Sequence, residues 1–475
     1  MSSLLNLAPD IVPALDPEFR PSWNALRAFR HAIGDAQGGV ALAFALERDG
    51  GATSRFTTAV LPPVHPRAVD NLRFAERLLK LLLWQRGARR VFVSGPEAIT
   101  RHLLDVYSAG GARAFDVDFF TKVYGRFQVE AVRAQELPEA RESPRQLGGH
   151  RDGCRVGFDA GGSDRKVAAL IDGKLVFSEE VVWQPKLQAD PAYHFAGIDS
   201  SIQSAARHLP RIDSIGVSSA GVYVDNRTRI ASLFRKVEEP AFSARIEPIY
   251  LDIAKKWGDV PIEVANDGDV AALAGALELD DGPVLGLALG TSLAAGYVDA
   301  HGRLQGFLNE LAFAPLDYAE SAPVDHEWSG DRGTAVHYLS QDGAVRLARR
   351  AGLELAGANA AEQLLELQAR ARSDEPRARS VYESLGVYLG YALLAFSEVY
   401  ALKHVLLLGR VTSGTGGRAL LEQAQRVLAH ESPELAARLT LHLPDESTRR
   451  VGQAVAAASL PALAARAGRG SGENR

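Results

Sequence analysis

The chain has 475 residues, of which 46% are hydrophobic and 23% charged, a composition typical of globular proteins that bury sizeable cores. Since a domain averages about 150 residues, this length and composition exclude both a single small module and a chain that is disordered throughout. The 53 Lys and Arg residues are outnumbered by 58 Asp and Glu residues, for a formal net charge of -5, which disfavours non-specific binding to nucleic acid.

The number of cysteines and the length of the apolar segments indicate the cellular compartment of the protein. Cys154 is the single cysteine, so no internal disulfide can form and no cysteine cluster can hold a structural zinc ion. The N-terminal segment carries acids and prolines where a signal peptide has an apolar stretch. The most apolar window, residues 284–298, is broken by glycines and is shorter than the ~18 residues of a membrane span. We therefore expect a cytoplasmic protein without a membrane partner.

The first 150 residues predict a small α/β unit. Residues 1–25 contain prolines and little hydrophobic pattern, which indicates a wrapping arm rather than a core element. The elements after this arm are a strand at 40–47, a glycine turn, a strand at 54–61, a helix at 68–87 and a strand at 90–95. Two interpretations stay open: a degenerate half-copy of a later lobe, docked on it or making a dimer contact, and an unrelated accessory domain.

A new unit begins near residue 154. The segment before it, residues 134–153, is charged, contains Pro and Gly and lacks a hydrophobic period, which predicts a linker. Residues 154–182 predict two apolar strands about a glycine turn, with Asp159 at the end of the first strand. Glycines let the backbone approach a ligand and present N–H groups, and a carboxylate can hold a cation or its water shell. The sequence DAGGS, residues 159–163, therefore predicts a phosphate-binding loop.

Two further segments place polar residues directly after apolar strands. After a helix at 202–210 and a strand at 214–221, residues 261–277 predict a strand that runs into an alanine-rich helix, with Asn266 and Asp267 at the junction. Residues 283–307 predict a third strand, turn and strand, and the turn of Gly290, Thr291 and Ser292 offers amides and two hydroxyls. This turn is a second candidate for a phosphate loop.

The C-terminal part ends in another glycine-rich turn. A long apolar helix at 384–402 precedes a strand at 404–409, a turn at 410–417 and a helix that begins at Arg418. Such a turn can lie against a flat purine. Residues 465–475 are polar and glycine-rich, which indicates a flexible tail.

Each of these features has a structural alternative when it is taken singly. Gly and Asp populate turns freely, so Asp159 could mark an ordinary hairpin. Asn266 and Asp267 could cap the helix that begins after them, and Glu310 could be a solvated charge. The turn at 409–417 could be a flexible loop. The occurrence of all of them in one order favours the functional interpretation.

Five segments in this order resemble the motifs of the ROK family (repressor, open reading frame, kinase), a sugar-kinase branch of the actin/hexokinase/Hsp70 superfamily. They are VGFDAGGSDRKVAALID, VANDGDVAALAG, LALGTSLAAGYV, LNELAF and LLLGRVTSGTGG. The resemblance covers residues 154–464. It implies an α/β fold of the two-lobed, actin-like ATPase (ribonuclease H-like) class, with residues 1–150 as an extra N-terminal α/β domain.

The resemblance also implies a function and a set of site residues. The function is phosphoryl transfer from ATP, or from polyphosphate, to a hydroxyl of a hexose-type sugar, with Asp267 as the general base between two lobes. Asp159 would orient Mg²⁺ through water. The residues implied to bind the sugar are Asn266, Glu310, Asn309 and Gly221. Those implied to bind the nucleotide or its phosphates are Asp159, Gly161, Gly162, Ser163, Lys166, Gly290, Thr291, Ser292, Gly409 and Gly414. A homodimer is a further expectation.

Three departures from the ROK pattern bear on these expectations. Phe313 stands where ROK kinases carry a zinc-binding His, and Glu327, Ser329 and Thr334 occupy the positions of the zinc-binding cysteines, so no zinc is expected. The second loop is poor in glycine, with Leu293, Ala294 and Ala295 after the turn. The first loop and the pair Asn309–Glu310 are similar to those of polyphosphate glucokinases, so the choice between ATP and polyphosphate stays open.

Two other functions remain as alternatives. A ROK-type transcriptional regulator would carry a short helix–turn–helix with a basic recognition helix before the core, whereas residues 1–150 predict strands and one long amphipathic helix. A sugar-binding pseudokinase is favoured by the missing His and the glycine-poor second loop, and is disfavoured by the presence of Asp159 and Asp267.

Overall fold

The computed structural model describes residues 3–36, 38–142, 147–444 and 446–463. The chain forms two compact units, each built from two stretches of sequence: unit 1 comprises residues 1–145 and 278–445, and unit 2 comprises residues 146–277 and 446–475. The tail expected at 465–475 lies outside the described residues. Among the described helices none is both long and apolar enough to span a membrane.

Unit 2 contains a five-stranded sheet of order β11-β8-β5-β6-β7. Its strands are β5 (Cys154–Ala160), β6 (Asp164–Ile171), β7 (Lys174–Val182), β8 (Ser214–Ser219) and β11 (Ile262–Asn266). β5, β8 and β11 run parallel, whereas β6 and β7 are antiparallel to their neighbours. Residues 154–182 thus form three strands and not the two predicted, because Asp172 (φ 47°) and Gly173 (φ 77°) make a second tight turn.

Helices cover both faces of this sheet. α5 (Pro191–Ala206) and α6 (Ile249–Lys256) share one core with Val156, Phe158 and Val217, while α13 (Glu446–Ala458) lies on the other face. A Cβ on Gly157 would lie 1.8 Å from the carbonyl oxygen of Ala454, and one on Gly216 1.7 Å from that of Ala457. These two glycines therefore let the backbone of α13 rest directly on the strands. Unit 2 also contains β9 (Val222–Val224), β10 (Arg227–Ile230) and most of α7 (Asp267–Leu279).

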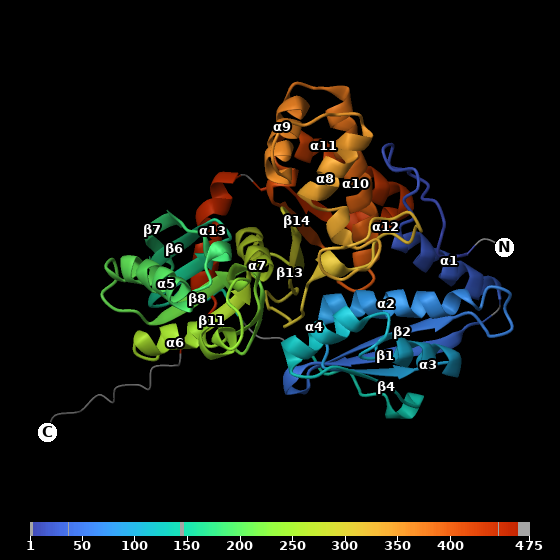
Figure 1. Ribbon diagram of the computed structural model, residues 1–475, viewed down its shortest axis with the longest axis horizontal. Coiled ribbons are helices and arrows are strands. Elements are labelled where there is room, and N and C mark those ends of the chain that lie inside the picture. Colours follow the sequence, from blue (N-terminus) through green and yellow to red (C-terminus); the bar gives the residue numbers. More distant parts are fainter. Residues whose placement is uncertain (1–2, 37, 143–146, 445, 464–475) are drawn as a thin grey trace. The chain divides into compact units, whose positions relative to one another are not determined.

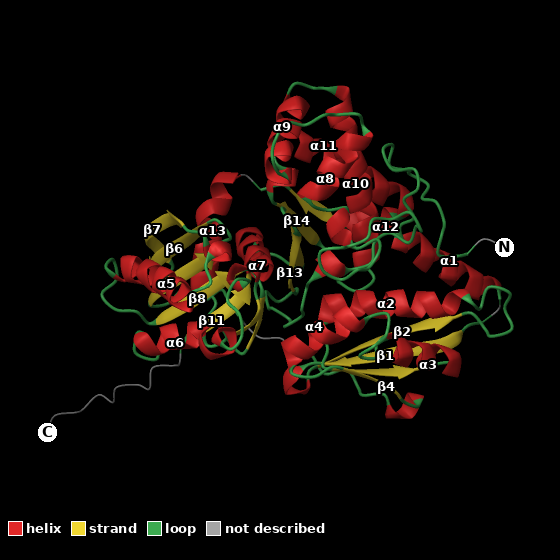
Figure 2. Ribbon diagram, viewed as in Figure 1, coloured by secondary structure: helices red, strands yellow, loops and turns green. Residues whose placement is uncertain are grey.

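The N-terminal part of unit 1 is a four-stranded sheet of order β2-β1-β3-β4 with flanking helices (Figure 2). Its elements are α1 (Ser22–Asp35), β1 (Val40–Glu47), β2 (Thr53–Val60), α2 (Asp70–Arg86), β3 (Arg90–Ser94), α3 (Glu97–Val106), α4 (Ala114–Tyr124) and β4 (Gln128–Ala131). β1 is antiparallel to β3, whereas β5 in unit 2 is parallel to β8. This difference in strand direction counts against the hypothesis that the N-terminal part is a half-copy of the core lobe. The hypothesis is not tested further by the structure.

The second part of unit 1 is a sheet of order β13-β12-β14-β15 next to a group of helices (Figure 1). Its strands are β12 (Val284–Leu289), β13 (Leu293–Val298), β14 (His404–Leu408) and β15 (Thr440–His442), and its helices are α8 (Gln341–Arg350), α9 (Ala360–Arg372), α10 (Pro376–Phe396), α11 (Gly414–Glu431) and α12 (Pro433–Arg438). α10 and α11 approach closely at Gly386, whose Cβ would lie 2.4 Å from the carbonyl oxygen of Leu420.

The N-terminal arm belongs to this core. Phe19 is 0% exposed and its ring lies 5.5, 4.8 and 6.1 Å from the rings of Tyr338, Tyr388 and Tyr391. The arm was expected to wrap the molecule without contributing to a core. The sequence did not predict that Phe19 is buried, because a single buried aromatic side chain produces no hydrophobic period.

Candidate active site

The parallel strands of unit 2 bring three polar chain segments to one edge of the sheet. Ala160 at the end of β5 and Asn266 at the end of β11 both pair with Ser219 at the end of β8. Asp159 therefore lies one residue before this row and Asp267 one residue after it. Ligands of open α/β sheets bind at the carboxyl ends of such strands.

Asp159 is a buried carboxylate with few partners. It is 5% exposed, its Oδ1 accepts a hydrogen bond of 2.7 Å from the Ser218 hydroxyl, and Lys166 Nζ lies 3.8 Å from its Oδ2. Burial raises the pKa of Asp159 to about 6, although the Ser218 hydrogen bond and the Lys166 charge act in the opposite direction. Lys166 itself is shared with Asp164, at 2.9 Å.

Asp267 is the first residue of α7 and follows β11 without a loop. Its Oδ1 accepts a hydrogen bond of 3.0 Å from the Gly268 backbone N–H. Burial raises its pKa, more than that hydrogen bond and the charge of Lys186 lower it. Its negative charge in turn raises the pKa of Asp159. A carboxylate of raised pKa is a better proton acceptor near neutral pH than an ordinary surface aspartate.

Two residues that the sequence did not reveal link the Asp159 carboxylate to the backbone of Asp267. Gln453 on α13 donates from Nε2 to the Ser218 hydroxyl at 3.1 Å and to the backbone carbonyl of Asp267 at 3.0 Å. Ser218 then donates to Asp159, so a chain of hydrogen bonds runs from α7 to β5. Ser218, as a polar residue inside an apolar strand, was a usable signal. Gln453 lies 186 residues from Asp267 and 294 residues from Asp159, so no local sequence pattern could indicate it.

The loop of residues 161–163 is held by the segment after β7. The Trp183 indole N–H donates to the Gly161 carbonyl at 2.8 Å, and the Trp183 backbone N–H donates to the Ser163 carbonyl at 3.1 Å. A Cβ on Gly162 would lie 3.1 Å from Lys186 Nζ. Lys186, another residue missed in the sequence, therefore places its ammonium group against this loop and within electrostatic range of Asp267.

The structure brings Asn266 and Gly221 together. Asn266 Nδ2 donates to the Gly221 carbonyl at 2.8 Å, and Asn266 Oδ1 accepts from the Gly268 N–H at 2.8 Å. The second contact is the helix-capping arrangement that the sequence left open as an alternative. Gly221 has φ 137°, and a Cβ there would lie 2.5 Å from the Ile230 carbonyl, so this glycine is needed for a close backbone approach.

Unit 1 carries the second loop and the glycine-rich turn side by side. β12 and β14 pair in parallel with Ala288 opposite Leu408, so both chain segments leave the sheet at the same edge. Thr291 and Ser292 are exposed, and the Gly290 carbonyl accepts from the Gln341 N–H at the start of α8, at 2.8 Å.

The glycine-rich turn is shorter than predicted. α11 begins at Gly414 and not at Arg418. A Cβ on Gly417 would lie 1.8 Å from the Thr412 carbonyl, and one on Gly416 2.4 Å from the Tyr382 ring. Two of the glycines thus pack the first turn of the helix against its surroundings. Gly409, with φ 92° next to Leu289, makes the close approach between the two strands.

The segment 309–313 is anchored on both sides of Glu310. Asn309 is 4% exposed, has φ 54°, and accepts a hydrogen bond of 2.7 Å from the Tyr400 hydroxyl at Oδ1. Its side-chain oxygen is therefore engaged inside unit 1. Glu310 is half-buried and precedes the short helical turn Leu311–Phe313.

Phe313, at the position of the expected His, packs into an aromatic cluster from the N-terminal part of unit 1. Its ring lies 4.3 Å from that of Trp84, 5.6 Å from Phe115 and 6.3 Å from Phe119. Two residues at the positions of the ROK zinc-binding cysteines have structural roles here. Ser329 donates to the Asp325 carboxylate at 2.6 Å, and Thr334 is fully buried.

Solved structures share this architecture, although no family model and no curated protein sequence matches the chain significantly. A ROK hexokinase from Thermus thermophilus matches 65% of this chain and 97% of its own, with a TM-score of 0.50 and 20% identity. A putative sugar kinase from Cytophaga hutchinsonii matches 64% of this chain and 98% of its own, with a TM-score of 0.50 and 13% identity.

The fold is that of the ROK family. A ROK-family transcriptional regulator, a homologue of the E. coli MLC protein, shares it as well, with a TM-score of 0.50 and 18% identity over 64% of this chain and 76% of its own. The two kinases are matched over nearly their whole length, so about a third of this chain is additional to the ROK fold.

Proposed function

We propose that the protein is a carbohydrate kinase that transfers a phosphoryl group from ATP or polyphosphate to a hydroxyl of a hexose-type sugar. The observation that supports this most is the pair of carboxylates at the strand ends of unit 2, the buried Asp159 and the half-buried Asp267. Ser218 and Gln453 link the Asp159 carboxylate to the Asp267 backbone. Phosphoryl transfer depends on positioning and charge neutralisation, for which such a pair beside amide-rich loops is suited.

Asp267 would be the general base. The sugar hydroxyl gives its proton to the Asp267 carboxylate while its oxygen attacks the terminal phosphorus of the donor, and the bond to the leaving phosphate oxygen breaks. The raised pKa of Asp267 suits it to take this proton near neutral pH. The hydrogen bond from Gly268 holds one oxygen of the Asp267 carboxylate in place. Because the carboxylate is planar, this also sets the direction of its other oxygen.

Asp159 fits a magnesium ion. Its carboxylate is buried, its pKa is raised to about 6, and the oxygen near Lys166 is at 3.8 Å from that ammonium group, longer than a hydrogen bond. A hard cation with oxygen ligands would offset this unfavourable charge. Bound Mg²⁺ would neutralise negative charge on the donor phosphates.

Each of the two glycine-containing loops carries groups that suit the phosphates of the donor. In unit 2, the amides of Gly161, Gly162 and Ser163 and the ammonium group of Lys186 form one phosphate-binding element. In unit 1, Gly290, Thr291 and Ser292 form another, and the segment from Gly409 to Gly414 would lie against the base of a nucleotide. The sugar would be bound by Asn266 and Glu310, with Gly221 and Asn309 shaping the backbone beside them.

Purified protein incubated with Mg²⁺, either ATP or polyphosphate, and a panel of hexoses and amino sugars tests this proposal. If the protein is a kinase, we expect a sugar phosphate to form, with one of the two donors preferred. Absence of product with every pair, together with sugar binding measured by calorimetry, would instead support a pseudokinase. Salt-sensitive binding to DNA would support a regulator.

A further inference from the structure

The N-terminal part of unit 1 is joined to the segment that carries Glu310 by its longest helix. The Gln85 carbonyl at the end of α2 accepts a hydrogen bond from the Asn309 N–H at 3.0 Å, and the Arg86 carbonyl accepts one from the Leu308 N–H at 3.3 Å. The last carbonyls of a helix lack partners within it, and here the backbone before Glu310 supplies them. Gly87 (φ 73°) ends the helix and brings it within contact of Leu308.

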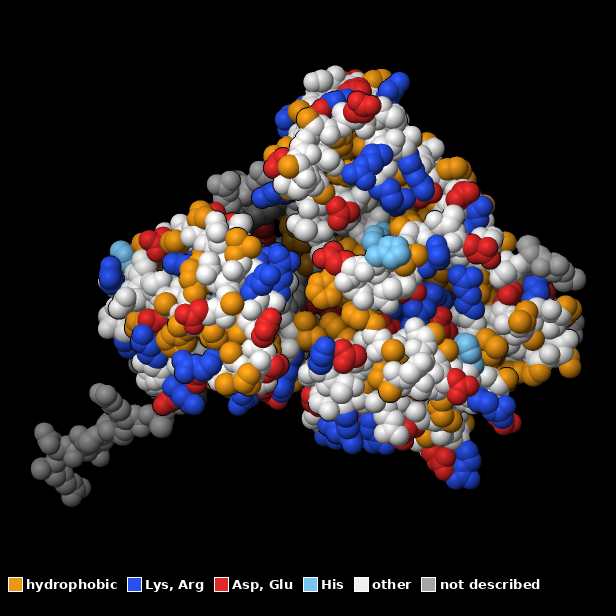
Figure 3. Space-filling model, in the orientation of Figure 1, with side chains coloured by type: hydrophobic (Ala, Val, Ile, Leu, Met, Phe, Trp, Pro, Cys, Tyr) orange, Lys and Arg blue, Asp and Glu red, His pale blue; other side chains and the backbone are white. Residues whose placement is uncertain are grey.

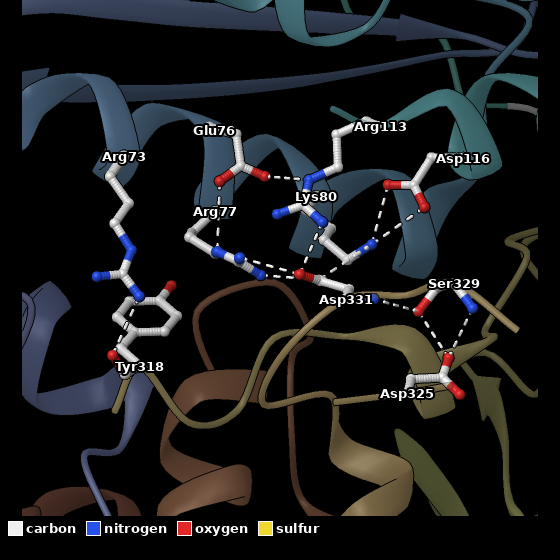
Figure 4. Close-up of polar contacts among 10 residues, drawn as sticks. All are labelled: Arg73, Glu76, Arg77, Lys80, Arg113, Asp116, Tyr318, Asp325, Ser329 and Asp331. Carbon is white, nitrogen blue, oxygen red and sulfur yellow. Dashed lines mark hydrogen bonds and ion pairs between the residues drawn. The ribbon is translucent and has the colours of Figure 1, made fainter. Parts of the chain in front are cut away.

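A second set of contacts holds the loop of residues 325–334, through a buried cluster of six charged side chains (Figure 4). Arg77 donates to both oxygens of Asp331, at 2.8 and 3.0 Å, and Arg113 NH1 lies 2.7 Å from Asp331 Oδ1. Lys80 Nζ lies 3.4 Å from Asp331 and 2.9 Å from Asp116. The sixth member, Glu76, accepts from Arg113 at 2.6 Å.

The charges of this cluster balance only when both parts of unit 1 contribute. Arg77, Lys80 and Arg113 face Glu76 and Asp116 within the N-terminal part, which leaves one positive charge, and Asp331 cancels it. Lys80 is 0% exposed and Asp331 5%. Burial raises the pKa of Asp331, and the charges of Lys80, Arg77 and Arg113 more than reverse that effect, so its pKa lies far below the ordinary value. Removal of one partner from such a buried group of charges leaves an uncompensated charge and destabilises the fold.

The loop that carries Asp331 is in turn bonded to the residues after Glu310. The Gly333 carbonyl accepts from the Leu316 N–H at 2.8 Å and from the Asp317 N–H at 3.0 Å, and the Ala335 N–H donates to the Ala314 carbonyl at 2.9 Å. A Cβ on Gly333 would lie 1.9 Å from the Asp317 carbonyl, so the two segments touch along their backbones. Glu310 thus lies between residues 308–309 and 313–317, and α2 holds both sides.

We propose that helix α2 positions the acceptor-binding segment around Glu310, with Arg77 and Trp84 as positioning residues. The inference rests on the proposed function for its substrate, and on the contacts above for its geometry. Arg77 acts through the carboxylate of Asp331, and Trp84 acts through the ring of Phe313. The N-terminal part of the chain is thereby a component of the sugar site. Displacement of a binding group by about 1 Å can cost up to 100-fold in rate.

The test uses the full-length double variant Arg77→Met/Asp331→Asn, which removes one charge of each sign and keeps the cluster balanced. We expect amide hydrogen exchange to accelerate in peptides covering 305–316 and 325–335, with no change in β12 and β14. We also expect the KM for the sugar to rise about tenfold or more, with kcat and the KM for the donor within about twofold of the wild type. Trp84→Leu, which leaves every charge in place, should give the same pattern.

The matched control is Lys122→Met/Asp118→Asn, which removes a balanced but exposed pair on α4, at 64% and 63% exposure, and should change neither readout. Unchanged exchange in both the double variant and Trp84→Leu would overturn the inference. So would accelerated exchange with an unchanged KM for the sugar. If the wild type phosphorylates no sugar, the proposed function fails, and the exchange data then decide alone whether α2 holds this segment.

Discussion

At the scale of single residues, Asp159 and Asp267 differ from ordinary surface acids because desolvation raises the pKa of both carboxylates more than their partners lower it. Asp159 accepts a hydrogen bond from the Ser218 hydroxyl and has the Lys166 ammonium group at 3.8 Å, and Asp267 accepts backbone hydrogen bonds from Gly268 and from its own N–H. Charges kept in this way cost folding free energy and are retained where a ligand needs them. The same property makes the two carboxylates testable by pH.

The stability of the protein should therefore depend on pH through Asp159. Its pKa is raised to about 6 in the folded protein, so its contribution to stability is fully present below the ordinary aspartate pKa and is lost as the pH rises to about 6. We expect Asp159→Asn, which cannot ionise, to be more stable than the wild type above pH 6 by up to about 3 kcal/mol, and inactive. Urea unfolding at pH 4, 6 and 8 measures this, and a difference that does not grow from pH 4 to 6 would contradict it.

Lys186 should contribute to donor binding. Its ammonium group lies against Gly162 and would neutralise phosphate charge there. We expect Lys186→Met to raise the KM for the donor about tenfold or more and to lower kcat, with the KM for the sugar little changed. Lys174→Met, at an exposed lysine of β7, is the control. Equal kinetics in the two variants would remove Lys186 from the site.

At the scale of elements, the position of α13 decides how Gln453 reaches Ser218 and the backbone of Asp267. The helix rests on Gly157 and Gly216, where a Cβ would meet its backbone at 1.8 and 1.7 Å. Backbone cannot yield as a side chain can, so the helix must move when either glycine gains a methyl group.

We therefore expect Gly157→Ala to destabilise the protein by about 1 to 3 kcal/mol or more and to lower kcat, because Gln453 moves with the helix. Gly452 lies on the same helix with no atom within 4 Å of its Cβ position. Gly452→Ala should stabilise the protein by about 0.5 to 1 kcal/mol through helix propensity alone. Thermal unfolding of both variants measures these effects. If the two variants shift the unfolding temperature in the same direction, α13 does not rest on the strand at Gly157.

The elements themselves were largely predictable, and the reasons for the failures are local. The strand at 40–47 matches β1, and the predicted helix at 68–87 matches α2, which its last predicted residue, Gly87, terminates. α11 begins four residues early because glycines that signal a turn can also be required for packing. Residues joined across long stretches of sequence, such as Gln453 with Ser218 or Trp84 with Phe313, leave no local pattern. Four of the five ROK-like segments were recognisable because each places Gly or Asp directly after a strand, which is a local feature.

At the scale of the whole molecule, one boundary between the compact units lies at 145/146, close to the division predicted near 150, and residues 1–145 share their unit with residues 278–445. Arg141 pairs with Thr53 in both directions, at 2.7 and 2.8 Å, so the predicted linker begins as part of the N-terminal sheet. α4, the second of two successive helices, buries Phe119, Phe120 and Asp116 and carries two Asp and one Lys. Such a helix does not resemble a basic recognition helix. On the face seen in Figure 3, basic and acidic side chains are interspersed over both units.

A chain that starts at residue 147 should not fold as a stable kinase, although it retains the ROK-like segments. Without the N-terminal part, Asp331 loses its three cations, Phe313 loses its aromatic neighbours, and the tyrosines around Phe19 become exposed. We expect this fragment to bind the dye ANS and to lack a cooperative thermal transition. A fragment with a sharp transition and sugar-kinase activity would show that the N-terminal part is dispensable.

The variant Asp267→Asn tests most directly whether the Asp267 carboxylate accepts the proton of the sugar hydroxyl. With the donor and sugar that the wild type prefers, we expect kcat to fall by about 10² to 10⁴ while sugar binding, measured by calorimetry, stays within about threefold. Asp269→Asn, two residues further along α7, should retain activity. If Asp267→Asn turns over at the rate of the wild type, Asp267 is not the base and the proposed mechanism is wrong.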